Sequence, residues 1–430
     1  LLNMDTLLVS RYDTSILNTE LSLTNAYLQF YKNNRDKILF SNISPEKAIP
    51  EKKVNELLLA DTLLLQHIDS SSNNSVAAQY ALLKQKLQMY ISMARQGEGQ
   101  PLNLKLRQIK KGSSSPDVPK IKKRLQQMGY PAVADSGKIF NDSLETVIKN
   151  YQQRNGMKPS GSITDTLLRS LNVPVAQRIQ QLIINLTRMQ WMPASQEVNY
   201  ISVNIPDFIL TVYENNTKAF DMPVVVGKEG ANTTMFSGSL DQIVFSPYWN
   251  IPNSIFQNEI LPKITADPNY LKKHHMEIVG KNSALPAIRQ LPGEDNPLGK
   301  VKFLFPNRYD IYFHDTKSKE IFKNDKRAVS HGCIRLADAE KMATYLLRNN
   351  NVWTPEKVHA AMNSGREQYV KLTNAVPVYI TYITAWVDEN NQVNFKDDVY
   401  GHDKKLAQMM FSNYPQPVLT TSKDSSLIKK

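Results

Sequence analysis

The sequence predicts a multidomain α+β protein, with a helical N-terminal scaffold, a small three-helix domain and a mainly β domain that carries an inserted subdomain. Its 430 residues exceed what one hydrophobic core usually organises, so about two to four domains are expected. Apolar residues recur every three or four positions through the first part of the chain, whereas from Tyr200 they alternate with polar residues. This change of period separates the helical part from the β part.

Residues 1–110 are predicted to form the helical scaffold. The clearest amphipathic helix in this segment has an apolar stripe made by Tyr80, Leu83, Leu87, Tyr90 and Ala94. Nothing in the segment points to chemistry, so we interpret it as packing. A loop rich in Ser and Pro at residues 112–119 marks the boundary with the next domain.

Residues 111–174 are predicted to hold three short helices. The first ends at Gly129, the second ends near Gly156, and the third is capped at its start by Thr164. Residues 175–198 then predict a connecting helix with apolar positions at spacings of three and four.

Residues 199–400 are predicted to form the mainly β domain. Short β-rich runs such as YISVNI and FILTVYE are separated there by Pro, Asn and Gly. Residues 252–298 combine helical character with many prolines and charges between two strands, which predicts an inserted lid or capping subdomain. Residues 401–430 are predicted to be a polar tail.

The net charge of +12 favours a polyanionic partner. The lysines and arginines are scattered, and no nucleic-acid-binding module is recognisable, so we expect no nucleic-acid partner. No window holds the roughly 18 consecutive apolar residues that a membrane span needs.

The single cysteine, Cys333, leaves no internal disulfide. If residues 309–314 and 330–336 are strands, their aliphatic side chains lie on one face. A buried structural cysteine would be expected on that aliphatic face, but Cys333 lies on the other. That opposite face carries Tyr312, His314, His331, Cys333 and Arg335.

This grouping suits nucleophilic catalysis, because a thiol needs a nearby base to react at neutral pH. His314 and His331 are the candidate bases, and Arg335 would favour the thiolate. The backbone amides of Gly332 and Cys333 are expected to face a developing oxyanion, since glycine allows close approach. The residues alone also fit a pair of surface histidines beside a half-exposed cysteine, and they leave that choice open.

Two segments within residues 116–174 read VPKIKKRLQQMGY and DSLETVIKNYQQRNGMKPSGSITDTLLRSLNVP. This stretch resembles the common peptidoglycan-binding domain of bacterial wall enzymes. Some domains of that type serve only as spacers. The resemblance therefore implies a wall-binding domain without assigning it a ligand.

A second resemblance lies in the β part. His314 is followed after fifteen residues by Ser330, His331, Gly332 and Cys333. This spacing resembles the active-site signature of L,D-transpeptidases with a YkuD-type catalytic domain. FSPYWNIPNSI and IRQLPGEDNPLGKVKFLFPN are further similar to the large YcbB-type members. These combine a helical scaffold, a peptidoglycan-binding domain and a catalytic domain with an inserted capping subdomain.

The resemblance implies catalytic roles for four residues and for the backbone around them. Cys333 would be the nucleophile, and His314 would be its general base, oriented by a backbone carbonyl near Asp315. His331 would shape the oxyanion site together with the amides of Gly332 and Cys333.

The resemblance also implies a substrate-binding set, with no cofactor and no metal. Tyr312 and Trp249 would line the donor groove, with Ser330 among the substrate-binding residues. Arg335 would bind a substrate carboxylate through its planar fork.

The implied reaction is acyl transfer between peptidoglycan stem peptides. The thiolate attacks the carbonyl of the third stem residue, expels D-alanine and forms a thioester. An amine of another stem then gives a 3→3 cross-link, whereas water gives carboxypeptidase activity. Carbapenem β-lactams would acylate the same cysteine. Because peptidoglycan lies outside the cytoplasmic membrane, we expect a periplasmic or envelope location, with room for an N-terminal anchor ahead of Leu1.

Three rival interpretations remain. His314, His331 and Cys333 are residue types that bind zinc, but a fourth ligand is not apparent. A wall endopeptidase would use the same cysteine and histidine logic. A non-catalytic wall-binding scaffold would need only residues 116–174.

Overall fold

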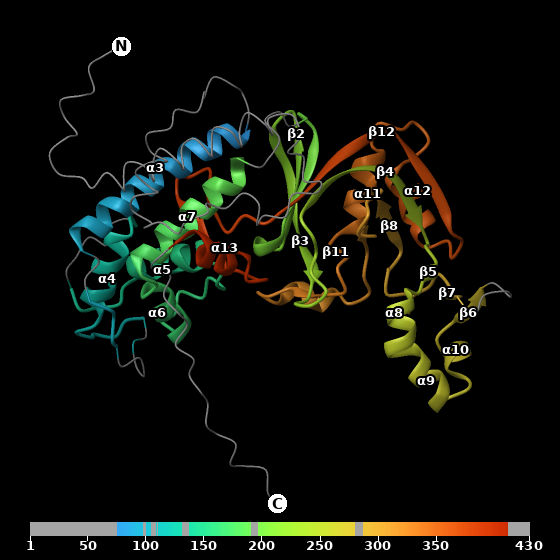
Figure 1. Cartoon of the computed structure of the whole chain (residues 1–430), viewed down its shortest axis with the longest axis horizontal. Coiled ribbons are helices and arrows are strands. Elements are labelled where there is room, and N and C mark those ends of the chain that lie inside the picture. The colour runs from blue at the N-terminus through green and yellow to red at the C-terminus, as the bar shows by residue number, and fades with distance from the viewer. Residues whose placement is uncertain are drawn as a thin grey trace, which may run out of the picture.

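The computed structural model describes residues 75–97, 100–104, 109, 111–130, 137–190, 197–279 and 287–411. Most of the predicted scaffold and the end of the predicted tail lie outside these residues. The described chain is elongated, with a helical part at one end and the β domain, which has helices of its own, at the other (Figure 1). No helix among the described residues has the length and apolar composition needed to cross a membrane.

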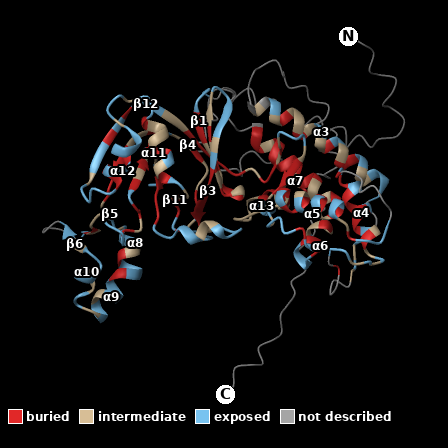
Figure 2. Ribbon diagram, turned by 180° about the vertical axis from the view of Figure 1, so that it is seen from behind, coloured by how far each residue is buried: buried red, intermediate tan, exposed pale blue. Residues whose placement is uncertain are grey.

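One helical core joins segments from distant parts of the chain. Helices α3 (Ser75–Gln96), α7 (Val175–Gln190) and α13 (His402–Met410) pack around it together with the hairpin of β13 (Ala385–Val387) and β14 (Val393–Phe395). Leu83, Leu87 and Tyr90 of the predicted stripe are buried there. Figure 2 shows the buried side of α3 turned toward α7.

The prediction of a polar tail from residue 401 was wrong for residues 402–410. These residues form α13, and Leu406, Ala407 and Met410 are buried against α7. Lysines on the exposed side of the helix hide an apolar face that repeats at helical spacing. The 385–395 hairpin likewise packs into the helical core rather than into the catalytic sheet.

The small domain contains the three predicted helices, α4 (Val118–Gln127), α5 (Asp142–Arg154) and α6 (Asp165–Leu171). The side chain of Asn141 caps α5 by accepting a hydrogen bond from the backbone amide of Leu144. Thr164 caps α6 in the same way through the amide of Leu167, as predicted. Buried residues from all three helices form one core.

The β domain is built on a nine-stranded mixed sheet in the order β10-β3-β11-β9-β8-β4-β12-β1-β2. An additional pairing between β2 and β3 closes the sheet on itself. Its main core also takes up α11 (Ala339–Leu347) and α12 (Pro355–Met362). The strands are β1 (Tyr200–Asn204), β2 (Ile209–Glu214), β3 (Thr217–Gly227), β4 (Phe236–Phe245), β8 (Val301–Leu304), β9 (Phe313–His314), β10 (Ala328–Ser330), β11 (Ile334–Leu336) and β12 (Gln368–Thr381).

The predicted insertion is a separate small subdomain below the sheet in Figure 1. It has its own three-stranded sheet, in the order β5-β7-β6, and a small core of Phe256, Ile260 and Ile288. Its elements are β5 (Trp249–Asn250), α8 (Asn253–Ile255), a π-helical turn (Phe256–Ile260), α9 (Leu261–Ala266), α10 (Tyr270–Lys273), β6 (Met276–Val279) and β7 (Ala287–Gln290). The helical character was predicted, but the sheet was not.

Candidate active site

The four residues Ser330 to Cys333 form a tight turn between β10 and β11, which we call the catalytic turn. The strands β10 and β11 lie on opposite sides of β3 and run in opposite directions relative to it. The prediction of one continuous strand over residues 330–336 was therefore wrong. Gly332 has φ +116, a conformation open to glycine but rarely adopted by other residues, and it interrupts the strand there.

Two side-chain hydroxyls hold the catalytic turn, one from Ser330 in the turn itself and one from Thr233 outside it. The hydroxyl of Ser330 donates to the carbonyl of Cys333 at 2.6 Å and accepts the amide of Gly332 at 3.2 Å. The hydroxyl of buried Thr233 donates to the carbonyl of Gly332 at 2.7 Å and accepts the amide of Gly227 at 2.8 Å. Ser330 is buried, so it shapes the turn and does not face a substrate as predicted. The amide of Gly332 is engaged by Ser330 and does not face an oxyanion in this conformation.

Cys333 is half-buried, and its thiol lies against the loop that precedes β9. The Sγ atom donates to the carbonyl of Asp310 at 3.5 Å. Burial raises the pKa of the Cys333 thiol, while hydrogen bonds from Tyr312 and the charge of Arg335 act in the opposite direction. The thiol therefore needs a base to react at neutral pH. Asp310 was missed from the sequence, since it contributes a backbone atom.

His314 lies next to the catalytic turn because β9 pairs with β11. Phe313 is opposite Ile334, and His314 is opposite Arg335, which places Cys333 beside Tyr312. The Nδ1 atom of His314 lies 2.6 Å from the carbonyl of Asp315, so Nδ1 carries the proton and Nε2 is left as an acceptor.

Burial and the charge of Arg335 lower the pKa of His314 to about 4, although backbone hydrogen bonds to Asp315 and Leu298 act against this. The imidazole is therefore neutral at pH 7, as a general base must be. Within the described residues the thiol is hydrogen-bonded to Asp310 rather than to His314. Catalytic hydrogen bonds are often long before substrate binds.

Arg335 is a half-buried cation without an acidic partner in the described part of the chain. Its Nε atom is inaccessible to solvent and has no hydrogen-bond partner there. Burial lowers the pKa of Arg335. Holding an unpaired charge away from water is costly, so the site is prepared for an anion that comes from outside.

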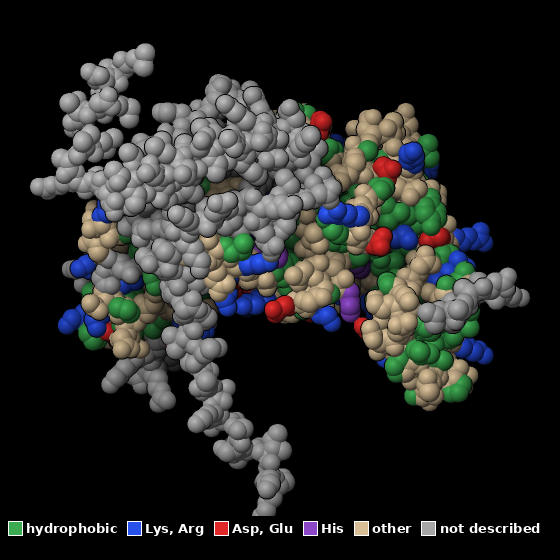
Figure 3. Space-filling view, viewed as in Figure 1, with side chains coloured by type: hydrophobic (Ala, Val, Ile, Leu, Met, Phe, Trp, Pro, Cys, Tyr) green, Lys and Arg blue, Asp and Glu red, His purple; other side chains and the backbone are tan. Residues whose placement is uncertain are grey.

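The inserted subdomain contacts the catalytic turn through His331. The Nε2 atom of His331 lies 3.1 Å from a carboxylate oxygen of Glu259 in the π-helical turn, and both side chains are about half exposed. Trp249, half-buried, pairs with Gln290 in the subdomain sheet, at the junction with the catalytic part. In Figure 3 a histidine lies at the hollow between this subdomain and the rest of the molecule. Among the described residues, no group of three or more His, Cys, Asp or Glu side chains is arranged to hold a metal ion.

Comparison with protein families matches residues 198–380 to the L,D-transpeptidase catalytic domain, YkuD, and residues 114–171 to a "Putative peptidoglycan binding domain". A Haemophilus influenzae protein described as "Putative L,D-transpeptidase" is 31% identical over 243 residues, which cover 53% of this chain and 49% of that protein. The chain thus spans about half the length of this relative.

Two solved structures are also similar. One is an L,D-transpeptidase (Yku) from Stackebrandtia nassauensis, with 14% identity, a TM-score of 0.26, and coverage of 65% of this chain and 97% of that one. The other is L,D-transpeptidase 3 from Mycobacterium tuberculosis in complex with a faropenem-derived adduct, with 12% identity, a TM-score of 0.22, and coverage of 43% and 60%. Residues 198–380 thus resemble an L,D-transpeptidase catalytic domain of the YkuD type, and residues 114–171, which precede them in the chain, resemble a peptidoglycan-binding domain.

Proposed function

We propose that this protein is an exported L,D-transpeptidase that forms 3→3 peptidoglycan cross-links through a thioester on Cys333. The observation that carries the proposal is the arrangement around the catalytic turn. A half-buried thiol lies beside a neutral, buried histidine and an unpaired arginine. This set supplies a nucleophile, a base and an anion-binding group on or next to adjacent strands.

In the first half-reaction, the Sγ atom of Cys333 leaves the carbonyl of Asp310 and transfers its proton to Nε2 of His314. The thiolate attacks the carbonyl carbon of the third stem residue, and a tetrahedral oxyanion forms. When the carbon–nitrogen bond breaks, His314 returns the proton to the departing D-alanine amine. A thioester remains on Cys333.

In the second half-reaction, a side-chain amine from another stem attacks the thioester. His314 takes a proton from this amine, and the thiol is regenerated with a new amide bond. The hydroxyl of Tyr312 remains protonated, because burial and nearby Cys333 raise its pKa. We assign it as a donor to the oxyanion, in the place left open by the engaged amide of Gly332.

Substrate placement follows from the charges and the inserted subdomain. Arg335 would bind a carboxylate of the donor stem, and Trp249 would line the donor groove beside Tyr312. The subdomain at residues 252–298 would act as a lid that limits water, with Glu259 holding the lid to His331. Trimming the lid should raise hydrolysis relative to cross-linking, and an unchanged ratio would contradict this role.

The decisive experiment incubates the protein with a disaccharide-tetrapeptide and follows both intact protein mass and products. Wild-type protein should gain the mass of a thioester adduct and yield 3→3 dimers, and Cys333→Ala should do neither. Tripeptides alone would indicate a carboxypeptidase, and cuts elsewhere in the stem that give shorter peptides would indicate an endopeptidase. Unmodified protein with no products would leave a wall-binding scaffold. A carbapenem should add its mass to wild-type protein and not to Cys333→Ala.

A further inference from the structure

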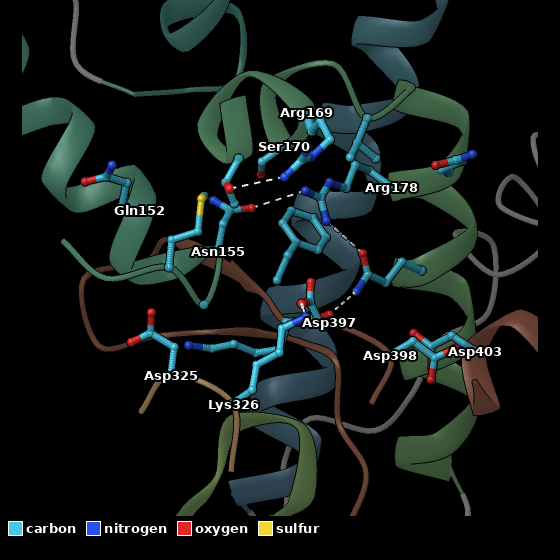
Figure 4. A pocket seen from close by; sticks show the side chains of 18 of the residues that line it. Gln152, Asn155, Arg169, Ser170, Arg178, Asp325, Lys326, Asp397, Asp398 and Asp403 are labelled. Carbon is cyan, nitrogen blue, oxygen red and sulfur yellow. Dashed lines mark hydrogen bonds and ion pairs between the residues drawn. The ribbon is translucent and has the colours of Figure 1, made fainter. Parts of the chain in front are cut away.

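A polar groove of about 900 Å³ lies between the peptidoglycan-binding-type domain and the catalytic part. Helices α5, α6 and α7 form one side of it, and the segments 325–326 and 395–404 form the other. Figure 4 shows Asn155, Arg169 and Arg178 above Asp325 and Lys326. Cys333 is not among the residues that line this groove.

The walls of the groove are fixed to each other by contacts between the domains. Arg154 of α5 pairs with Asp388 of the β13–β14 hairpin at 3.1 Å. The guanidinium of Arg178 lies over the ring of Phe395, 4.3 Å from its centre. The amide of Gln181 donates to the carbonyl of Lys396 at 3.1 Å. These contacts connect residues more than two hundred positions apart, so the groove has a defined shape.

The chemistry of the lining suits a polar, weakly anionic chain. Nine amide or hydroxyl side chains line it, Asn155, Ser160 and Gln177 among them, together with six basic side chains. Lys158 and Arg169 are exposed and have no acidic partner in the described part of the chain. Four aspartates also line the groove, namely Asp325, Asp397, Asp398 and Asp403. This mixture of charges disfavours a dense polyphosphate and fits sugar hydroxyls with occasional carboxylates.

Gln180 provides an independent sign of a missing partner. It lines the groove from α7, and its side chain is only 2% exposed. Its amide nitrogen has no hydrogen-bond partner among the described residues. Buried polar groups are normally satisfied, and an exception requires an explanation. A ligand with a carbonyl or hydroxyl oxygen would satisfy this donor.

Hydrogen bonds connect a residue beside the groove to the back of the catalytic turn. Tyr400, next to groove residue Gly401, donates its hydroxyl to the carbonyl of Gly227 at 2.6 Å and accepts the amide of Thr233 at 3.2 Å. Thr233 in turn bonds the carbonyl of Gly332 at 2.7 Å. Lys326, on the same side of the groove as Gly401, is only seven residues before Cys333, a span of at most about 25 Å.

We propose that this groove binds the glycan strand of peptidoglycan, a chain of N-acylated amino sugars, while a stem peptide of the same strand reaches Cys333. The choice of ligand rests on the proposed function. N-acyl carbonyls and sugar hydroxyls would bond Gln180 and the neighbouring amides, and carboxylates on the strand would meet Lys158 and Arg169. The site is shared by two domains, so neither would bind the strand equally well alone.

The test uses full-length Cys333→Ala protein and glycan oligomers stripped of their stem peptides, so that binding is measured without turnover. Gln180→Met keeps the side-chain volume and removes the unpaired donor, and it should weaken binding at least five-fold without lowering the melting temperature. Lys158→Ala should weaken binding two- to five-fold. The matched variant Lys123→Ala, on the exposed side of α4 and outside the groove, should bind like the parent.

Glycan binding that is equal in the parent, Gln180→Met and Lys158→Ala proteins would overturn the proposal. The proposal would also be overturned if a single-stranded oligonucleotide displaced the glycan and if Gln180→Met weakened the binding of that oligonucleotide. If wild-type protein forms no thioester but the glycan affinities follow the expected order, the groove stands and the transpeptidase proposal fails. If acylation is normal but no glycan binds, the transpeptidase proposal stands and the groove proposal fails.

Discussion

Replacing Arg335 with methionine should lower catalysis sharply while leaving the fold at least as stable. Arg335 makes no ion pair within the described residues, and its buried Nε has no partner. Its removal therefore breaks no bond that stabilises the folded protein, and it relieves the cost of a half-buried unpaired charge. The loss falls instead on the thiolate and on the donor carboxylate, both of which the guanidinium would face.

The magnitude follows from the kind of interaction. A hydrogen bond to a charged group contributes about 1.5–3 kcal/mol, which corresponds to about 10- to 150-fold in kcat/KM. The free energy of unfolding should change by less than about 1 kcal/mol, because only the packing of the aliphatic stem is affected. Since the charge of Arg335 lowers the pKa of Cys333 and of His314, both pKa values should rise in the variant.

Three assays check these effects on the same protein. Acylation by a carbapenem gives kcat/KM for thioester formation, iodoacetamide alkylation against pH gives the thiol pKa, and urea unfolding gives stability. Arg327→Met is the control, since that guanidinium donates to the carbonyls of Phe208, Val224 and Asn324 and its loss should cost roughly 2–4 kcal/mol of stability. The reasoning is refuted if Arg335→Met is destabilised as strongly as Arg327→Met, or if it is acylated at the wild-type rate.

Three further predictions concern the surroundings of the thiol. Thr233→Val should lower the free energy of unfolding in urea by about 2–4 kcal/mol and slow acylation, because it leaves two buried backbone groups, including the carbonyl of Gly332, without a hydrogen-bond partner. Thr233→Ser should behave like wild type. Equal losses in the two variants would contradict this. His314 is protonated more readily in the unfolded chain than in the fold, so roughly 3 kcal/mol of stability should be lost as the pH falls from about 6.5 to about 4. His314→Gln should abolish that loss. If the free energy of unfolding depends on pH identically in both proteins, His314 is not the source. Glu259→Gln breaks an exposed contact with His331, so the free energy of unfolding should change by under about 1 kcal/mol. The ratio of hydrolysis to cross-linking in a product assay should rise up to about five-fold. A constant ratio would argue against the lid.

The helical elements were predictable because their signals are local. Thr164 caps α6 through an amide three residues away, and the stripe on α3 repeats within one helix. Helix α13 carried such a stripe as well, but its lysines and its position at the end of the β domain favoured the prediction of a tail. The change of period located the β part, but it gave neither the break in the strand at residues 331–333 nor the order of strands in the sheet.

The catalytic turn was not predictable as a turn because its burial pattern still alternates. Ser330, Gly332 and Ile334 are buried, and the residues between them are more exposed, as they would be in a continuous strand. The difference lies in the φ angle of one glycine, which has no distinct signature in the sequence. The role assigned to Ser330 failed for a related reason, since its hydroxyl is used by two backbone groups of the same turn.

The partners that hold the site come from far along the chain, and no local pattern marks them. Thr233 lies 99 residues from Gly332, and Tyr400 lies 173 residues from Gly227. Glu259 reaches His331 from a separate subdomain. Each is a single polar residue in a loop or turn, so its importance depends on tertiary packing that sequence periods do not encode.

These distant contacts converge on the same four-residue turn from two sides. Glu259 approaches it from the lid, and Tyr400 approaches it through Thr233 from the segment that lines the interdomain groove. The contact with the lid is a single exposed side-chain contact between Glu259 and His331, which opens at little cost. The contact with the groove is made of buried hydrogen bonds and does not open without stranding polar groups. The fold therefore couples the turn firmly to the groove side and loosely to the lid side; under the proposed function, this coupling would let the enzyme stay on one glycan strand while the lid admits successive stem peptides.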